Sequence, residues 1–525
     1  MLKRFKSLGL SVKITFILMI LISLTASFFI FKDIFTYELH HAYTADAPLY
    51  WAVGRGMLNG LTPYAQMYEN KPLGIFLISA LSFGLTGSSI ICNIFSILAA
   101  LMITFIPVLA VLNGYDQNDH RKTDTTKKLV VSLMVLMGGL LITTYTEMRS
   151  GGFQVEAIGA AFSVLFIYLV MKLKNAKTRR QTVILTVCSA LALGCSVMIK
   201  EPFLLTCVFG ALLFIDSFKS FLKHLLLPCA AGGVLVLIVL AVSGTLPSYF
   251  SIYISRMFGT RLAGDSGSSA FTRAKNILFL TKDIRNFNVW LFYLLIAFLV
   301  FTLLYGILKK RKVTFILMHV IKVAAAIFAA SFCVGMGGQY YNHHYIFAVP
   351  IYVAFLICGA MMFYEFDTKN LVPAVAIWGV VLAAVILSIG NPYAGDYTAK
   401  YHDITVKAQY VDSLLDHYQE DRYQFIGFNG EDAFIGLTEH SPRGPVFAQD
   451  PDNFRSADTW FAQNLLQQID ESNIVIVKEF KSPAVDEEIQ RKLNAEFTES
   501  PTEKYEISPP EGFNCRIYYR TSKYQ

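Results

Sequence analysis

Long apolar runs separated by short polar stretches dominate the first 390 residues of the chain. About 20 mostly apolar residues are needed to cross the hydrocarbon core of a bilayer, so eleven of these runs are predicted to be membrane-spanning helices. The first run is too long for the core of a signal peptide and predicts an uncleaved first span. The predicted spans are 11–31, 89–112, 129–146, 153–172, 182–199, 202–216 (the shortest), 225–243, 288–308, 314–335, 344–363 and 371–390.

A twelfth apolar run, 72–87, is short, and the placement of Lys and Arg predicts whether it crosses. Basic residues collect in the cytoplasmic loops of membrane proteins. If 72–87 only lies at or dips into the outer face, every dense basic loop of the chain falls inside, whereas most of them fall outside if it crosses. We therefore predict that 72–87 does not cross, that the N-terminus is cytoplasmic, and that the C-terminal part is outside the cell. Two long outer loops result, 32–88 and 244–287.

The last part of the chain, 391–525, has the pattern of a soluble domain. Short apolar runs at 423–428, 445–448, 473–480 and 515–520 predict strands, and amphipathic stretches near 403–420, 458–470 and 485–496 predict helices. Strands that alternate with helices indicate a small α/β domain. The predicted fold class is therefore a polytopic α-helical membrane protein, residues 1–390, with a C-terminal extracytoplasmic α/β domain, residues 391–525.

Composition and charge agree with this division. The 525 residues are 54% hydrophobic and only 16% charged, whereas soluble domains have about 25% charged residues. The tail 391–525 has 23 acidic and 13 basic side chains, so the net charge of +7 comes from the membrane part. A basic membrane part is explained by its cytoplasmic loops, and nucleic-acid binding is not implied. The eight cysteines show neither a disulfide framework nor zinc-binding spacing.

The outer loop 32–88 contains the first candidates for chemistry. Asp46 lies shortly after the first span, where a carboxylate could accept a proton from a hydroxyl group. Tyr50 and Tyr64 could stack on a sugar ring or stand at the membrane interface. Lys71, in Lys71-Pro72, is a natural contact for an anion. The alternatives are a solvated loop carboxylate for Asp46 and a snorkelling lysine at the start of an interfacial helix for Lys71.

Further candidates lie at the predicted outer ends of later spans. Glu156 is inside an apolar segment, where a carboxylate usually lines a cavity or pathway, although partial hydration one turn from the membrane surface is the alternative. Lys200, in Lys200-Glu201-Pro202, either faces a lipid phosphate or belongs to a helix-connecting turn with a local ion pair. His343, His344 and Tyr345 form either a polar pocket or an aromatic interface belt. Adjacent residues point to different faces of a helix, so the two histidines are not expected to bind one metal ion.

The order and placement of these motifs resemble the membrane glycosyltransferases of the GT-C fold. Bacterial relatives of protein O-mannosyltransferase and lipid A aminoarabinose transferase, which are similar to glycosyltransferase family 39, are the nearest match. The resemblance covers most of the chain. It rests on Asp46 after the first span, Gly60-Leu61-Thr62-Pro63-Tyr64, Lys71-Pro72, Glu156 in the fourth span, Lys200 at the fifth, and the His344-Tyr345 pair before the tenth.

The resemblance implies transfer of a sugar from a polyprenyl-phosphate carrier to an acceptor hydroxyl on an envelope glycan, lipid or protein, at the outer face of the plasma or inner membrane. It implies that Asp46 is the general base, and that Lys71, Lys200 and Arg256 or Arg261 hold the phosphate. It also implies that Glu156, His343, His344 and Tyr345 shape the sugar pocket. No cofactor is required by the sequence. Many members have an Asp-Glu pair in the first loop, but Ala47 follows Asp46 here, so a divalent metal is possible but unsupported.

Two other functions fit the helices. A transporter or lipid flippase would use the intramembrane Glu156, but it predicts symmetry-related broken helices, which the sequence does not show. A non-catalytic scaffold that presents the acidic tail predicts that binding to a partner survives removal of all the charged outer-face residues. The clustering of these residues at one inferred depth argues against it.

Overall fold

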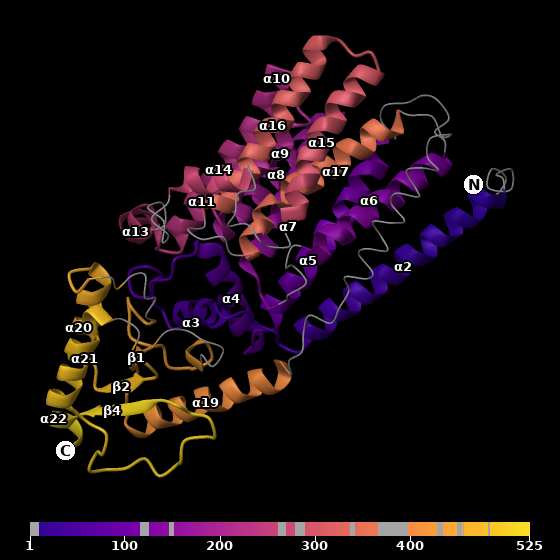
Figure 1. The fold of residues 1–525 in the computed structure, drawn as a ribbon. Coiled ribbons are helices and arrows are strands. Elements are labelled where there is room, and N and C mark those ends of the chain that lie inside the picture. The colour runs from indigo at the N-terminus through magenta and orange to yellow at the C-terminus, as the bar shows by residue number, and fades with distance from the viewer. Residues whose placement is uncertain are drawn as a thin grey trace.

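A computed structural model gives the arrangement of the chain (Figure 1). The structure describes residues 10–115, 125–145, 152–260, 269–278, 289–336, 342–365, 397–427, 434–448, 454, 456–480 and 483–525. A bundle of long helices makes up the first part of the chain. A smaller α/β unit lies against one end of this bundle, the end opposite the first turns of α2 (Figure 1). The bundle helices are α2 (Leu10–Leu39), α5 (Ile90–Tyr115), α6 (Thr125–Tyr145), α7 (Val155–Lys174), α8 (Arg179–Ile199), α9 (Phe203–Leu212), α11 (Leu227–Val242), α15 (Val289–Leu308), α16 (Val313–Gly335) and α17 (Val349–Tyr364).

Eight helices among the described residues are long and apolar enough to cross a membrane. Large apolar side chains on their outer faces are exposed, including Leu24, Val242 and Leu317, as expected for surfaces that contact lipid. Each of the eight corresponds to a span predicted from the sequence. The segments are Ile17–Leu39, Ile90–Asn113, Lys127–Thr144, Val155–Lys174, Arg179–Ile199, Phe218–Val242, Val313–Gly335 and His343–Tyr364. The predicted span 288–308 corresponds to α15, and the predicted span 371–390 lies outside the described residues.

The predicted span 202–216 has only ten helical residues, in α9. It nevertheless runs beside α7 from one end to the other. At its start, Lys200 pairs with Glu156 in the first turn of α7. At its end, Lys174 in the last turn of α7 donates hydrogen bonds to the carbonyl of Phe214 and to Asp216. A short helix followed by irregular chain therefore covers the length that a full helix covers elsewhere in the bundle.

Basic residues lie at the end of the bundle opposite the tail. Lys172 and Lys174 end α7, and Lys309 to Lys312 connect α15 to α16. Arg311 and Lys309 contact Glu365 at the end of α17, and Lys127 stacks over Tyr364. This clustering of basic residues at one end is the arrangement that the positive-inside argument requires.

Two short helices, α3 (Ala47–Leu58) and α4 (Leu73–Thr86), lie between the bundle and the tail (Figure 1). Pro48 in the first turn of α3 and Pro72 at the N-cap of α4 begin these helices. Helix α4 has 14 residues, so it is about 21 Å long and shorter than the roughly 30 Å hydrocarbon core. Gly54 permits close packing of the pair, because a Cβ there would lie 2.5 Å from the Cβ of Ser79.

The tail contains a four-stranded sheet in the order β1-β2-β4-β3. Strands β1 and β2 are parallel, and β4 is antiparallel to both β2 and β3. The three helices predicted from the sequence are present as α19, α20 and α21. The described elements are α19 (Tyr397–His417), β1 (Gln424–Ile426), η6 (Phe434–Gly436), α20 (Trp460–Asp470), β2 (Ile474–Val477), α21 (Pro483–Glu496), β3 (Phe497–Thr498), β4 (Arg516–Arg520) and α22 (Thr521–Tyr524).

The strand predicted at 445–448 is wrong. The carbonyl of Pro445 accepts a hydrogen bond from the backbone N–H of Tyr68 in the membrane part, and the side chains of Val446 and Phe447 are buried. Proline lacks the N–H that a central strand needs. The segment therefore fills the contact between the tail and the membrane part, and the short β3 takes the edge of the sheet.

Candidate active site

A buried carboxylate and a backbone hydrogen bond connect the loop that contains Asp46 to the neighbouring segments. Glu38, in the last turn of α2, accepts hydrogen bonds from the side-chain amide of Asn93 at 2.7 Å and from the backbone N–H of Gly152 at 2.9 Å. The backbone N–H of Thr44 donates to the carbonyl of Gly152 at 2.9 Å. These bonds join the end of α2 to the start of α5 and to the loop before α7, and they fix the turn that leads into α3.

Asp46 lies at the N-cap of α3 and its side chain is 55% exposed. The hydroxyl of Tyr50, one helical turn later, donates to Asp46 Oδ2 at 3.2 Å. Lys71 Nζ is 3.9 Å from the same oxygen. Burial and the neighbouring carboxylates of Asp46, Glu69 and Glu156 raise the pKa of Tyr50 well above its ordinary value. Tyr50 therefore remains a neutral phenol that orients the carboxylate, and the exposed side of Asp46 is open to a substrate.

Lys71 is held by the loop that precedes α4. Its side chain is only 11% exposed, and its ammonium group lies 3.6 Å from Glu69 and donates to Asn70 at 2.9 Å. It also lies 5.4 Å from the centre of the Tyr50 ring. The hydroxyl of Tyr64 donates to the carbonyl of Lys71 at 3.0 Å. These contacts hold the ammonium group beside Asp46.

Tyr64 is fully buried and has a φ angle of 66°, which is unusual for a bulky side chain. Its ring packs against Tyr249, Tyr253 and Phe76. It therefore forms part of the wall behind Lys71 and is not an open stacking platform. Residues in this region of backbone space persist where the surroundings over-determine them, as they do at many functional sites.

A second ion pair lies at the ends of α7 and α8. Glu156, in the first turn of α7, is 3% exposed, and its Oε1 lies 3.4 Å from Lys200 Nζ. The amide of Gln154 donates to its other oxygen at 3.0 Å. Lys200 thus pairs with a carboxylate on the neighbouring helix α7, a partner that neither interpretation of the sequence named, and its charge also acts on Glu201 in its own turn. A buried carboxylate without such partners would be costly.

His343 and His344 come from η4 (Asn342–Ala348), directly before α17. One nitrogen of each imidazole and one oxygen of Glu156 all lie within 4.8 Å of one another. The premise of the sequence expectation, that the two histidine side chains point apart, is therefore wrong, and binding of one metal ion by both stays a prediction. The backbone directions of neighbouring residues do diverge, but rotation about the two side-chain torsions, with two nitrogens in each ring, brings the donor atoms together.

The ion pairs Asp46–Lys71 and Glu156–Lys200 lie near each other and, with His343 and His344, are called the cluster from here on. The charges of Lys200, His343, His344 and Lys71 all act on Glu156, and Glu156 in turn acts on Tyr50. Close packing of α4 on α8 explains why the two lysines are near each other. A Cβ at Gly74, three residues after Lys71, would lie 2.7 Å from the carbonyl oxygen of Met198, two residues before Lys200.

Two further predicted site residues are Arg256 and Tyr345, of which only Tyr345 lies beside the histidines. Arg256, on α13 (Ser255–Thr260), stacks over the ring of Trp460 in the tail, at 5.1 Å from its centre. Tyr345 is fully buried in η4, beside the two histidines. Arg261, the alternative to Arg256, lies outside the described residues.

Sequence reasoning missed Glu69 and Glu201. Glu69 contacts Lys71. The only sequence signal for this contact is that Glu69 lies two residues before Lys71. Glu201 accepts a hydrogen bond from Tyr253 in η3 (Tyr249–Ile254). Burial raises the pKa of Glu201, while the hydrogen bond from Tyr253 and the charges of Lys200 and Lys71 lower it in part. No sequence pattern indicates the contact between Glu201 and Tyr253, because 52 residues separate them.

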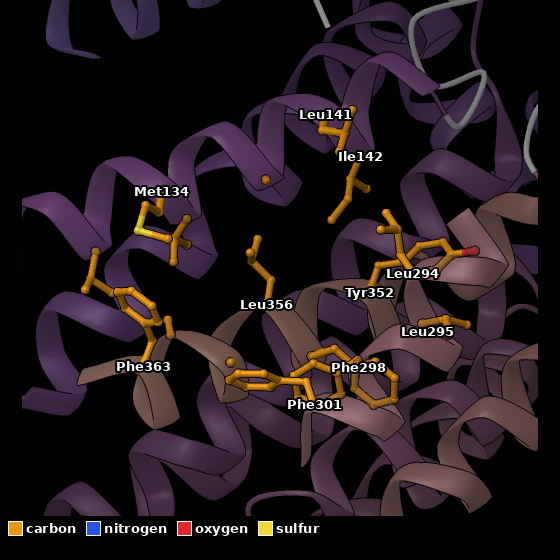
Figure 2. A pocket seen from close by; sticks show the side chains of 16 residues that line it. Met134, Leu141, Ile142, Leu294, Leu295, Phe298, Phe301, Tyr352, Leu356 and Phe363 are labelled. Atoms are coloured by element: carbon orange, nitrogen blue, oxygen red, sulfur yellow. The ribbon is translucent and has the colours of Figure 1, made fainter. Parts of the chain in front are cut away.

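An apolar cavity of about 350 Å³ lies within the bundle, between α6, α15 and α17 (Figure 2). Its lining is aliphatic and aromatic, with the hydroxyl of Tyr352 as one polar group. Such a cavity inside membrane-spanning helices suits a hydrocarbon chain better than a polar solute. The residues labelled in Figure 2 are Met134, Leu141, Ile142, Leu294, Leu295, Phe298, Phe301, Tyr352, Leu356 and Phe363.

Comparisons with known proteins add two similar structures. No family model matches the chain, and no curated protein matches it. Two crystal structures of ArnT from Cupriavidus metallidurans are similar, one bound to undecaprenyl phosphate and one in the apo state. They are 11% and 9% identical, with TM-scores of 0.47 and 0.49, and each match covers 95% of this chain and 97% of the other.

Proposed function

We propose that this protein is a membrane glycosyltransferase of the GT-C type. It moves a sugar from a polyprenyl-phosphate carrier to a hydroxyl group of an envelope glycan, lipid or protein. The observation that supports this most directly is the convergence of one exposed carboxylate and two lysines at one end of the bundle. These groups come from three separate segments, around Asp46, Lys71 and Lys200.

The cluster suits an inverting transfer. The acceptor hydroxyl attacks the anomeric carbon of the sugar, its proton passes to Asp46, and the bond from that carbon to the phosphate oxygen breaks. The phosphate departs with the bonding electron pair, and the ammonium groups of Lys71 and Lys200 stabilise the negative charge that it gains. Asp46 is 55% exposed and oriented by Tyr50, as a base that meets an incoming acceptor should be.

The remaining predicted residues would shape the sugar pocket. Glu156, His343 and His344 offer hydrogen-bond acceptors and donors beside Lys200. Tyr345 and Tyr64 are fully buried, so they would support the wall of the pocket. Arg256 stacks on Trp460 and would act at the boundary with the tail, farther from the phosphate than the sequence suggested.

The carrier would place its phosphate at the lysines and its prenyl chain among the spans. The apolar cavity between α6, α15 and α17 offers one surface for such a chain (Figure 2). In this proposal the cluster is at the outer face of the plasma or inner membrane, the N-terminus is cytoplasmic, and the tail is extracytoplasmic.

The test is transfer of radiolabel by purified full-length protein. It would be supplied with a panel of polyprenyl-phosphate sugars and a cell-envelope fraction as the source of acceptors. Asp46→Asn should lower the rate by about 10²–10⁴-fold, the usual contribution of a general base, without changing the thermal midpoint. Asp403→Asn, at a carboxylate of the tail that pairs with Lys407, is the matched control and should leave transfer unchanged.

Near-normal turnover of Asp46→Asn would exclude Asp46 as the base. Absence of transfer from every donor, with folded protein, would favour the transporter or flippase. That rival predicts movement of a lipid-linked substrate across vesicles without formation of a product.

A further inference from the structure

Three side chains in the cluster have the donor chemistry of a metal site. Glu156 supplies a carboxylate oxygen, and His343 and His344 each supply an imidazole nitrogen, all within 4.8 Å of one another. Glu156 and His344 are 3% and 5% exposed. Within the described residues, no other group of three or more His, Cys, Asp or Glu side chains has donor atoms arranged in this way.

We propose that Glu156, His343 and His344 bind a divalent transition-metal ion, with zinc as the best match. Two imidazoles and one carboxylate are a common protein ligand set for zinc, and imidazole also suits other late transition metals. Magnesium and calcium prefer sets of oxygen ligands. The site should therefore select zinc over magnesium.

Three protein ligands leave one position of a tetrahedral zinc ion open, as in catalytic zinc sites. The charges of Lys200 and Lys71 also act on Glu156, so the surroundings of the open position favour an anionic or water oxygen. A phosphate oxygen of the donor is the natural fourth ligand, next to the lysines that would hold the same group. This role rests on the proposed function, whereas binding of the ion does not.

Binding of the ion requires an exchange of partners. One oxygen of Glu156 lies 3.4 Å from Lys200 Nζ, and the other accepts from Gln154 at 3.0 Å. An ion at Glu156 would replace one of these contacts and free Lys200 to face the substrate. Removal of the competing ammonium group, as in Lys200→Met, should therefore leave zinc binding as tight as in the native chain or make it tighter.

Metal content and affinity can be measured without substrate. The full-length protein in detergent would be stripped with a chelator, treated with a thiol-blocking reagent because its eight cysteines are free, and loaded with zinc or magnesium. After removal of excess ion, mass spectrometry of the metal should find about one zinc per chain and no retained magnesium. Cobalt in place of zinc should give visible absorption bands of a tetrahedral site.

Glu156→Gln, His343→Gln and His344→Gln should each weaken zinc binding at least about tenfold, since loss of even an outer-shell partner can have that effect. His319→Gln, at a histidine on α16 that bonds the carbonyl of Phe315, is the matched control and should keep the zinc. His343 is only half-buried, so His343→Gln provides a test if the Glu156 variant fails to fold. Lack of zinc retention by the native chain, or equal retention by the three variants, overturns the proposal. Zinc bound without any sugar transfer would contradict only the proposed function.

Discussion

At the scale of single residues, the two lysines of the cluster have different partners. Lys71 lies between Asp46, Glu69 and Asn70, whereas Lys200 pairs with the buried Glu156. Two cations near one another can stabilise a phosphate that neither would hold alone, because charge develops on several oxygens as the phosphate leaves. This arrangement gives a prediction that separates a catalytic lysine from a structural one.

Lys200→Met and Lys71→Met should each lower kcat for sugar transfer by about 10²–10³-fold, as removal of one group that stabilises developing charge does elsewhere. Steady-state kinetics with a lipid-linked donor would measure this. Lys174→Met is the control, since Lys174 also pairs with a carboxylate, Asp216, but at the far end of α7. If the Lys174 variant loses as much activity as the Lys200 variant, a general effect on folding explains both.

The sequence predicted the residues that stand out against an apolar or motif background. Asp46, Lys71, Glu156 and Lys200 are charged groups at helix ends, so position along the chain is enough to find them. Glu69 and Glu201 are ordinary loop carboxylates in the sequence, and only their contacts with Lys71 and Tyr253 draw attention to them. The roles of all these residues stay predictions until they are tested.

At the scale of elements, glycines decide how closely the parts of the cluster approach. Gly152, at a φ angle of 82°, faces the backbone of the Asp46 loop, and a Cβ there would lie 2.6 Å from the carbonyl carbon of Tyr43. The backbone N–H of Gly152 also donates a hydrogen bond to the buried carboxylate of Glu38. The loop before α7 and the loop after α2 are therefore closely packed and joined by hydrogen bonds.

Gly152→Ala should displace the turn that contains Asp46 and lower kcat, in addition to destabilising the protein by about 2 kcal/mol from strain at a left-handed backbone position and overpacking. Thermal unfolding and transfer kinetics would measure the two effects. Gly244→Ala is a close control, because Gly244 has a similar φ of 71° but open space around its Cβ position. Gly244→Ala should therefore show only the destabilisation that comes from backbone strain. Equal loss of kcat in both variants would contradict the contact between Gly152 and the loop.

At the scale of the whole molecule, the tail is docked onto the helices that contain the site (Figure 1). A Cβ at Gly436 of η6 would lie 2.5 Å from the carbonyl oxygen of Pro48, two residues after Asp46. The amide of Asn59, at the end of α3, donates to the carbonyl of Glu439 and to Ser441. The same tail loop is tied to α19, because Asp412 accepts the backbone N–H groups of Glu439 and His440.

His440 is expected to make the stability of the folded protein depend on pH. Burial alone would lower its pKa, but hydrogen bonds to Asp416 and to the carbonyl of Asp421, with the charges of Asp412 and Asp416, raise the pKa of His440 above 6.5. Because the folded-state pKa is the higher one, the stabilisation is fully present below about pH 6.5 and is lost as the pH rises through the folded-state pKa. The thermal midpoint of the native protein should therefore exceed that of His440→Gln at pH 6, and this difference should shrink by pH 9.

Measurement of both midpoints across this range, by a dye that reports unfolding in detergent, would check the prediction. His402→Gln is the control, since His402 is an exposed histidine on the same helix, α19. A difference between the native protein and His440→Gln that is independent of pH would show that His440 acts by packing and not by its charge.

By itself, the sequence determined the membrane-spanning helices that the structure describes, the short helix α4 before α5, and most elements of the tail. Each of these follows from local patterns of apolar residues, because the free energy of placing a segment in lipid or in a core depends mainly on its own side chains. Tertiary structure decided the rest. The pairing of Lys200 with Glu156, the meeting of His343 and His344, and the loss of the strand at 445–448 depend on close packing between segments far apart in the chain, at contacts such as Gly74 on Met198. No local pattern reports such contacts, since the fit of two packed surfaces is a property of both together.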